Sequence, residues 1–351
     1  MKRIFRKSPV LLIMGLVIVS LFVFVIGVSV GPVSIPFFSV WKIIFSKITG
    51  YNINGIDINI INIAWNLRFP RVILGFVVGA GLAISGVAIQ SFTKNPLSEP
   101  YILGVSSGAS AGAVLVALNG FLVSHIGYYA MPLGAFLGAV ISLTTVYVLS
   151  LNKEGRVNPF QLIFLGIATS AMFMAITNFV VFSAKYDAGV RTAMFWMMGS
   201  LAGVKWAYLP IPIFILFGSF IVFMILYRAM NTMLLGESTA IMLGINIRRS
   251  RKIIVIISSL LAGAIVSVSG SIGFVGLIIP HIVRNMIGSN HKYVLPCSLL
   301  LGGNFIVLAD MIARVVVMPQ ELPIGIITAI LGAPFFIYLL KKNKYSFGGK
   351  Y

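Results

Sequence analysis

The chain has 351 residues, of which 59% are hydrophobic and only 9% are charged, and its mean hydropathy is +1.05. A soluble domain carries about 25% charged residues, so this composition excludes a water-facing globular protein and indicates a polytopic membrane protein. The net charge of +19 does not indicate a nucleic-acid partner, because the basic residues stand in short clusters between apolar runs, where they anchor loops.

The first predicted element follows Lys2, Arg3, Arg6 and Lys7. A basic start before an apolar run resembles a signal peptide, but this run is too long and lacks an Ala-x-Ala-like exit, so we expect an uncleaved membrane helix. Windows of about 20 residues predict ten spans in all. They lie near residues 9–31, 70–92, 101–119, 128–151, 160–183, 208–227, 253–270, 272–287, 293–311 and 323–340.

The distribution of lysine and arginine predicts the orientation. If the N-terminus is inside and the spans alternate, 18 of the 26 basic residues lie inside and 8 lie outside. Because cytoplasmic loops carry the excess of positive charge, this split favours both termini inside and an even number of spans.

Glycines predict how the helices meet. Gly75 and Gly79 are four residues apart, as are Gly104 and Gly108, and each pair therefore occupies one helix face. The same spacing links Gly108 to Gly112, and Gly134 to Gly138. Glycines in this pattern let two backbones approach closely, which is how helices pack in lipid. We expect a dense bundle.

A faint internal repeat is present. Gly79-Ala80-x4-Ser85-Gly86 recurs as Gly263-Ala264-x4-Ser269-Gly270, and the two copies run oppositely across the membrane in the predicted topology. Inverted halves are typical of transporters, but chance in so biased a composition remains the alternative.

The spans carry no charged residue at mid-depth, which argues against a proton-coupled carrier. The chain has no G-x-x-x-x-G-K-[ST] phosphate loop, so any ATPase must be another polypeptide. His125, His281 and His291 are scattered and are interpreted as structural residues rather than metal ligands. Cys297 is the only cysteine, which excludes an intramolecular disulfide.

The segment 228–252 is the largest predicted inside feature. Glu237 to Met242 has helix-forming character, Gly244 stands where a helix would end, and basic residues follow. From the residues alone, a surface that docks on a soluble partner and an ordinary positive-inside loop are equally good interpretations.

Several motifs, taken together, resemble FecCD-type permeases, the membrane subunits of ABC importers for iron-siderophores, haem and cobalamin. The motifs follow one another over nearly the whole chain, the poorest match being the Asn/Ile-rich stretch 48–64, which is predicted as a polar outer loop. They are RFPRVILGFVVGAGLAISGVAIQSFTKNPLSEPYILGVSSGASAG from Arg68, GFVGLIIPHIVR from Gly273, ADMIAR from Ala309, ELPIG from Glu321 and LGAPFF from Leu331.

The resemblance implies one all-α permease domain over residues 1–351 with about ten membrane helices, two inverted-like halves and a type II ABC importer architecture. It implies a homodimer, or a heterodimer with a sister permease, in the bacterial cytoplasmic membrane, with both termini cytoplasmic. Two ATP-binding subunits would bind inside and a substrate-binding protein or lipoprotein outside. ATP and Mg²⁺ would be held by the ATPase, so this chain is expected to be neither an enzyme nor a holder of cofactors or metals.

The resemblance also assigns roles to particular residues. Coupling to the ATPase is expected of Glu237, Ala240, Leu243, Gly244 and Ile245. A cytoplasmic gate is expected at Asn95, Leu97, Asn158 and Pro159. Docking of the binding protein is expected at Arg68, Arg71 and Arg314. The simpler alternatives are anchoring of the second span by Arg68 and Arg71, and a local pair of Arg314 with Asp310, four residues earlier.

The cargo is open. An iron-siderophore is the commonest cargo among family members and leads, with haem and cobalamin as alternatives. An ion-coupled secondary carrier and a membrane-embedded sensor or channel are the competing functions of other classes.

Overall fold

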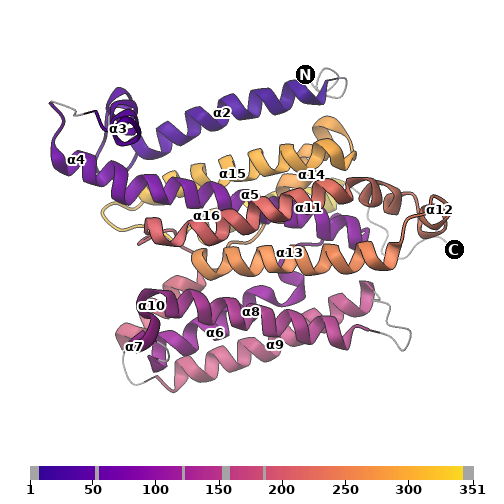
Figure 1. Ribbon diagram of the computed structural model, residues 1–351. Helices are drawn as coiled ribbons and strands as arrows, with labels where there is room; N and C mark the ends of the chain where they lie inside the picture. The colour runs from indigo at the N-terminus through magenta and orange to yellow at the C-terminus, as the bar shows by residue number, and fades with distance from the viewer. Residues whose placement is uncertain (1–7, 52–54, 121–122, 152–158, 185–186, 343–351) are drawn as a thin grey trace.

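The computed structural model describes residues 8–51, 55–120, 123–151, 159–184 and 187–342, and these residues contain helices and no strands. A helix occupies each of the ten predicted places (Figure 1). These helices are α2 (Pro9–Ser29), α5 (Phe69–Thr93), α6 (Val105–Asn119), α8 (Ala130–Leu149), α9 (Pro159–Phe182), α11 (Pro210–Leu234), α13 (Ile247–Ser269), α14 (Val275–Ile287), α15 (His291–Val315) and α16 (Ile324–Lys342). In the described part of the chain, 8 helices are long and apolar enough to cross a membrane, and α6 and α14 are shorter apolar helices.

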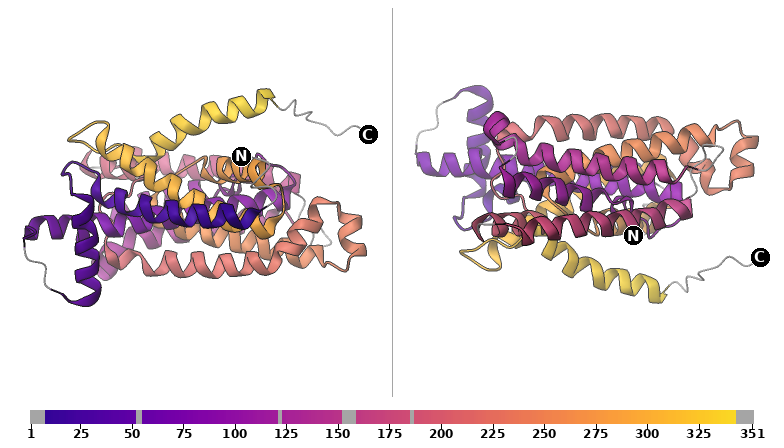
Figure 2. Two further views of the ribbon diagram at one scale, coloured as in Figure 1. Left: turned by 90° about the horizontal axis from the view of Figure 1, so that it is seen from above. Right: turned by 90° about the horizontal axis from the view of Figure 1, so that it is seen from below.

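Shorter helical segments join the long ones. They are α3 (Phe37–Thr49), α4 (Ile58–Asn62), η1 (Ile63–Arg68), η2 (Pro100–Leu103), α7 (Val123–Ile126), η3 (Gly127–Tyr129), α10 (Asp187–Met197), η4 (Trp206–Tyr208) and α12 (Glu237–Met242). The axes of most long helices are roughly aligned, in either direction, whereas the axis of α3 lies across them at one end of the bundle (Figure 2). At the opposite end α12 projects from the bundle (Figure 1).

The second membrane helix begins earlier than predicted. We expected it to start near residue 70, after a polar loop, but α4, a π-helical turn (η1) and α5 form one continuous helix over Ile58–Thr93. Pro70 has no backbone N–H to donate, so it sits without penalty at the start of a helical segment, and the wide turn just before it keeps the chain helical. The N–H of Phe69 bonds the carbonyl of Ala64 in the π pattern. The predicted polar loop is therefore largely helix in its described residues.

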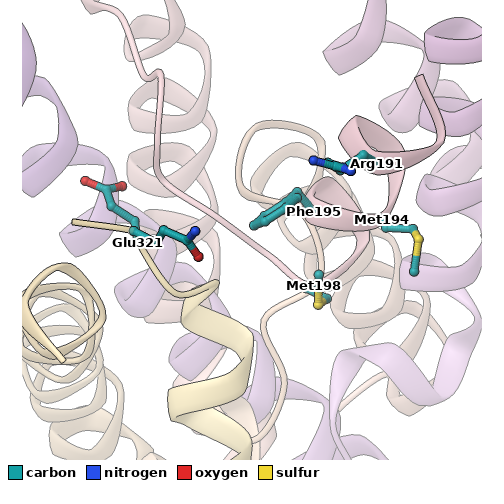
Figure 3. Close-up of a pocket in the computed structure, with 6 residues that line it drawn as sticks. Arg191, Met194, Phe195, Met198 and Glu321 are labelled. Carbon is teal, nitrogen blue, oxygen red and sulfur yellow. The ribbon is translucent and has the colours of Figure 1, made fainter. Parts of the chain in front are cut away.

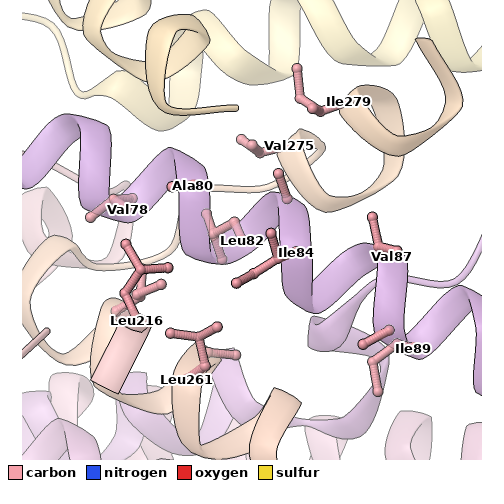
Figure 4. Close-up of a cluster of buried hydrophobic side chains, with 14 of the residues drawn as sticks. Val78, Ala80, Leu82, Ile84, Val87, Ile89, Leu216, Leu261, Val275 and Ile279 are labelled. Carbon is pink, nitrogen blue, oxygen red and sulfur yellow. The ribbon is translucent and has the colours of Figure 1, made fainter. Parts of the chain in front are cut away.

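The centre of the bundle is α5. In the helix that contains α5, 89% of the apolar 18-residue stretch that could span the membrane is buried inside the bundle. The corresponding stretches of α2 and α9 are each only 22% buried. Figure 4 shows side chains of α5, among them Leu82 and Ile84, facing Leu216 of α11, Leu261 of α13 and Val275 of α14. A helix that is apolar on all sides must be enclosed by protein or by lipid, and α5 is enclosed by the other helices.

Glycines bring the central helices into backbone contact, as predicted. A Cβ on Gly108 would overlap the carbonyl oxygen of Gly138, and one on Gly112 would overlap that of Gly134. The backbones of α6 and α8 therefore meet directly at these glycines. Gly79 of α5 meets Gly302 of α15 in the same way. The hydrophobic effect is weak between helices in lipid, so close packing of this kind is what holds them together.

The faint repeat is confirmed in direction only. α5 runs toward the end where α12 lies, and α13 starts there and runs back (Figure 1). However, Gly86 lies inside α5, whereas its counterpart Gly270 is the residue after α13, with φ +67. The ungapped register therefore pairs positions in different structural settings.

Candidate functional site

A layer of buried charge lies at the α4 end of the bundle. Arg71, in the first turn of α5, donates from Nε to Asp310 Oδ1 over 2.9 Å and from Nη1 to Glu321 Oε2 over 2.8 Å. The Nε of Arg314 is 3.1 Å from Asp310 Oδ2. Asp310 is only 1% exposed, so two arginines share one enclosed carboxylate. Opposite charges in such an enclosed place compensate the loss of water only while every partner is present.

Arg68 and Arg314 close the end of α2. Nη1 of Arg68 donates to the carbonyl oxygens of Val28 and Ser29 over 2.9 and 3.0 Å. Nη2 of Arg314 donates to Gly27 O over 2.9 Å, and its Nη1 to Val30 O over 2.8 Å. The last carbonyls of a helix have no partner within that helix and carry partial negative charge. The two guanidinium groups supply the missing donors.

These contacts change the expectation for docking. Arg68, Arg71 and Arg314 are 5%, 8% and 2% exposed, and their guanidinium groups are taken up by partners within this chain. A direct pair with an acidic residue of a binding protein would require releasing a buried group from those partners. The simpler alternative for Arg314, a pair with Asp310, is confirmed. Docking through the three arginines stays an untested prediction, and the geometry opposes it.

A pocket of about 570 Å³ opens beside this layer. Arg191, Met194 and Phe195 of α10 form one wall, and Glu321 stands opposite (Figure 3). Gln320 also lines the pocket. Glu321 belongs to both features, because its carboxylate accepts from Arg71 at the pocket wall. The pocket is therefore lined by a cation, Arg191, and by methionine and phenylalanine side chains, and it reaches the buried ion pairs through Glu321.

At the opposite end, α12 forms an exposed apolar knob, here called the α12 knob, of Ile241, Met242 and Leu243. Their exposures are 64%, 85% and 59%. Ala240 is fully buried beneath them, and the N–H of Ile245 bonds its carbonyl over 3.0 Å. Gly244 follows with φ +76, a conformation that glycine adopts freely, so the helix ends there as predicted. Glu237 begins α12.

The turn after α5 contains Asn95 and Leu97, two of the predicted gate residues. It follows the end of α5, which lies beside the end of α11, the helix that leads into α12. Asn95 Oδ1 accepts the N–H of Leu97 over 2.9 Å, which fixes the turn locally. Ser91 Oγ donates to Met230 O over 3.4 Å, linking the end of α5 to the end of α11. Of the other two gate residues, Pro159 begins α9, and Asn158 lies outside the described residues.

Sequence reasoning missed a carboxylate in this turn. Glu99 is hydrogen-bonded to the backbone of Phe274, the residue before α14, and burial raises the pKa of its carboxyl. The signal was a glutamate between two proline-containing turns, in a chain with only seven acidic residues.

The histidines do not form a metal site. His125 contacts Ser124 at the surface, His281 stacks edge-on to Phe335 with ring centroids 6.2 Å apart, and His291 is buried against Asn231. Within the described ranges, no group of three or more His, Cys, Asp or Glu could hold a metal ion. Cys297 is a free, buried residue.

Comparisons with known proteins agree with this architecture. The model of the FecCD transport family matches residues 17–342. The chain is 39% identical over 318 residues to an uncharacterised ABC transporter permease protein, YvrB, of Bacillus subtilis, covering 90% of this chain and 89% of that protein. It is 33% identical to the hemin transport system permease protein HmuU of Yersinia pestis, with 95% and 96% covered. It is 35% identical to the Fe(3+)-citrate import system permease protein YfmE of Bacillus subtilis, with 96% of each covered.

A solved structure is similar over its whole length. It is described as an inward-facing conformation of a metal-chelate type ABC transporter, and it matches with a TM-score of 0.81 and 30% identity, over 94% of this chain and 99% of that one. An ABC importer permease is the class of protein that these findings define. The chain belongs to the FecCD transport family.

Proposed function

We propose that this chain forms the membrane pathway of an ABC importer for an iron-siderophore complex, with haem or cobalamin as the alternative cargo. ATP is hydrolysed by separate subunits that bind the α12 knob, and a binding protein delivers cargo at the α4 end. The pathway is shared with a second permease, either a copy of this chain or a sister chain. The membrane is the bacterial cytoplasmic membrane, with both termini on the ATPase side.

The observation that carries the ATPase assignment is the α12 knob. Three large apolar side chains stand exposed on a short helix that is anchored by buried Ala240. Exposed apolar groups beyond the membrane mark protein interaction sites. The basic residues that begin α13, Arg248 and Arg249, follow directly and place positive charge beside the knob.

Support for a metal chelate comes from the pocket beside α10 and from the relatives. The pocket offers Arg191 as a cation beside Met194, Phe195 and Met198, a lining that suits a bulky ligand with anionic and apolar parts. The similar permeases carry the names of iron chelates, hemin and cobalamin. A ferric chelate that carries free carboxylates would place them against this cation.

The coupling role is tested with Leu243→Ser. We expect the variant to keep its thermal stability but to lose most co-purification of the ATPase, because an apolar contact of the interface is removed. Ser238→Ala, another exposed position of α12, is the matched control and should retain the ATPase. Equal ATPase recovery from both variants would remove the α12 knob from the interface.

The cargo is tested by uptake in cells that lack the chain. Radiolabelled ferric citrate, a ferric hydroxamate, hemin and cobalamin are compared side by side, with and without the restored gene. We expect uptake of a ferric chelate to depend on the gene and on ATP. Gene-dependent uptake of hemin or cobalamin alone would select the alternative cargo, and uptake abolished by an ionophore while ATP is intact would favour an ion-coupled carrier.

A further inference from the structure

An apolar groove on the side of the bundle lies apart from the features described above. It has a volume of about 470 Å³ and is bordered by α8 on one side and by α11 on the other, with α13 as its floor. α13 packs against both neighbours. The volume falls within the range of about 300–1,000 Å³ typical of small-molecule sites. No residue of the pocket beside α10 takes part in it.

The groove is elongated along the helices that border it, and therefore along the membrane normal. Its walls run from Tyr129 to Phe136 along α8 and from Tyr208 to Ile215 along α11. Seven residues of helix correspond to about 10 Å at a rise of 1.5 Å per residue. The only hydroxyl of the floor, Ser267, donates to the carbonyl of Ala264 over 2.8 Å and so offers no free donor. The interior is suited to hydrocarbon and not to a polar ligand.

The rim of the groove is aromatic, and a lysine lies next to it. Tyr208 donates to the carbonyl of Tyr128, and Tyr129 donates to the carbonyl of Ala207, both over 3.2 Å. These two bonds tie the starts of α8 and α11 together, so the mouth is formed in advance. Nζ of Lys205 lies 5.3 Å from the ring centre of Tyr128. Tyrosine and tryptophan gather where the membrane core meets the headgroups, which places the rim at that level.

The groove also opens sideways toward lipid. Leu133 and Ile211 line it and are 41% and 62% exposed, and Phe214 beside it is 80% exposed. We propose that the groove holds one acyl chain of a phospholipid from the leaflet at the end opposite α12, with the anionic phosphate of that lipid bound by Lys205. The cation next to the rim and the apolar interior below it match the two parts of a phospholipid in their order along the membrane normal.

The test is native mass spectrometry of the purified full chain, with phosphatidylglycerol and phosphatidylcholine as the added lipids. We expect one bound phospholipid on the wild type, with phosphatidylglycerol preferred. Leu133→Trp fills the groove and should remove this adduct. Leu137→Trp, one turn further along α8, at 46% exposure and outside the groove, should retain it. Equal adducts on both variants would overturn the proposal.

The headgroup contact is tested separately. Lys205→Ala should reduce the preference for phosphatidylglycerol about fivefold, the effect expected for one lysine at an anionic surface. Lys42→Ala, an exposed lysine of α3, should leave the preference unchanged. An unchanged preference in Lys205→Ala would overturn the assignment of the phosphate.

A photoreactive amino acid at position 133 distinguishes the occupants. Cross-links to phospholipid are expected in native membranes. Cross-links to a second copy of this chain or to another protein would show that the groove is a protein interface and would overturn the lipid assignment.

Discussion

Two clusters at opposite ends of the bundle, the buried ion pairs and the α12 knob, handle polar and apolar groups in opposite ways. At the α4 end, Arg68, Arg71 and Arg314 turn inward, where Asp310, Glu321 and the carbonyls at the end of α2 receive them. At the α12 end, apolar side chains turn outward, and Met242 is 85% exposed. Charge that is satisfied internally stabilises the fold, whereas an exposed apolar surface is available to a partner, as proposed for the α12 knob. Substitutions at the α4 end should therefore change stability, and those in the α12 knob should change assembly.

The largest effect is expected for Asp310→Asn. Without the charge of Asp310, Arg314 remains enclosed with no carboxylate partner and Arg71 keeps only Glu321, and breaking a buried pair in this way costs about 3–5 kcal/mol. Thermal unfolding in detergent is the measurement. Asp57→Asn, at an exposed helix start, should change little because asparagine caps helices as well as aspartate. A similar melting temperature for the two variants would show that the α4 end is not held by its ion pairs.

A smaller loss of stability is expected for Arg68→Met. The change leaves the carbonyls of Val28 and Ser29 without donors, and each unsatisfied buried group costs about 1–3 kcal/mol. Arg191→Met, at an exposed arginine of the same end, is the control and should unfold like the wild type. If Arg68→Met is as stable as this control but weakens association with the binding protein, the docking role would be restored.

Gly244→Ala compares the two ends directly. Its φ of +76 is matched by Gly50, the residue after α3, at φ +75, and a Cβ would meet open space at both positions. A left-handed alanine costs about 1–2 kcal/mol, so both variants should lose the same small amount of stability. Only Gly244→Ala should also reduce ATPase recovery. Equal recovery with the two variants would contradict the contrast between the ends.

The smallest effect is expected for Glu99→Gln, and it depends on pH. Because the pKa of Glu99 is raised in the folded chain, its contribution to stability is complete below its unfolded pKa of about 4.3 and is lost as pH rises through the folded pKa. Glutamine cannot ionise, so the variant should gain in melting temperature relative to the wild type as the pH rises above about 4.3, the pKa of an unperturbed glutamate. Asp57→Asn should show no such trend. A constant difference across this range would mean that Glu99 is not enclosed.

Local patterns in the sequence predicted much of the fold. Apolar windows placed all ten apolar helices, and the four-residue glycine spacing predicted close helix packing, of which the contact of α6 with α8 is an example. The pair of Arg314 with Asp310 was also accessible, because residues four apart share a helix face. In contrast, Arg71 meets Asp310 across a separation of 239 residues, and spacing along the chain carries no information about such a contact. The carbonyl partners of Arg68 could not be predicted either, because every residue has a backbone carbonyl and the sequence does not show which one a side chain will reach.

The backbone contact of α5 with α15 limits how this molecule can move. Gly79 faces Gly302 with no room for a Cβ. Sliding α15 by one helical turn, about 5.4 Å, would bring Ser298 or Ile306 against Gly79 and force the helices apart. We therefore expect α5 and α15 to move as one rigid unit, and α6 and α8 to move as another. A change from one opening to another would then have to tilt the α5–α15 pair against the α6–α8 pair, and α13, which packs against both α5 and α8, lies where the two pairs would move against each other.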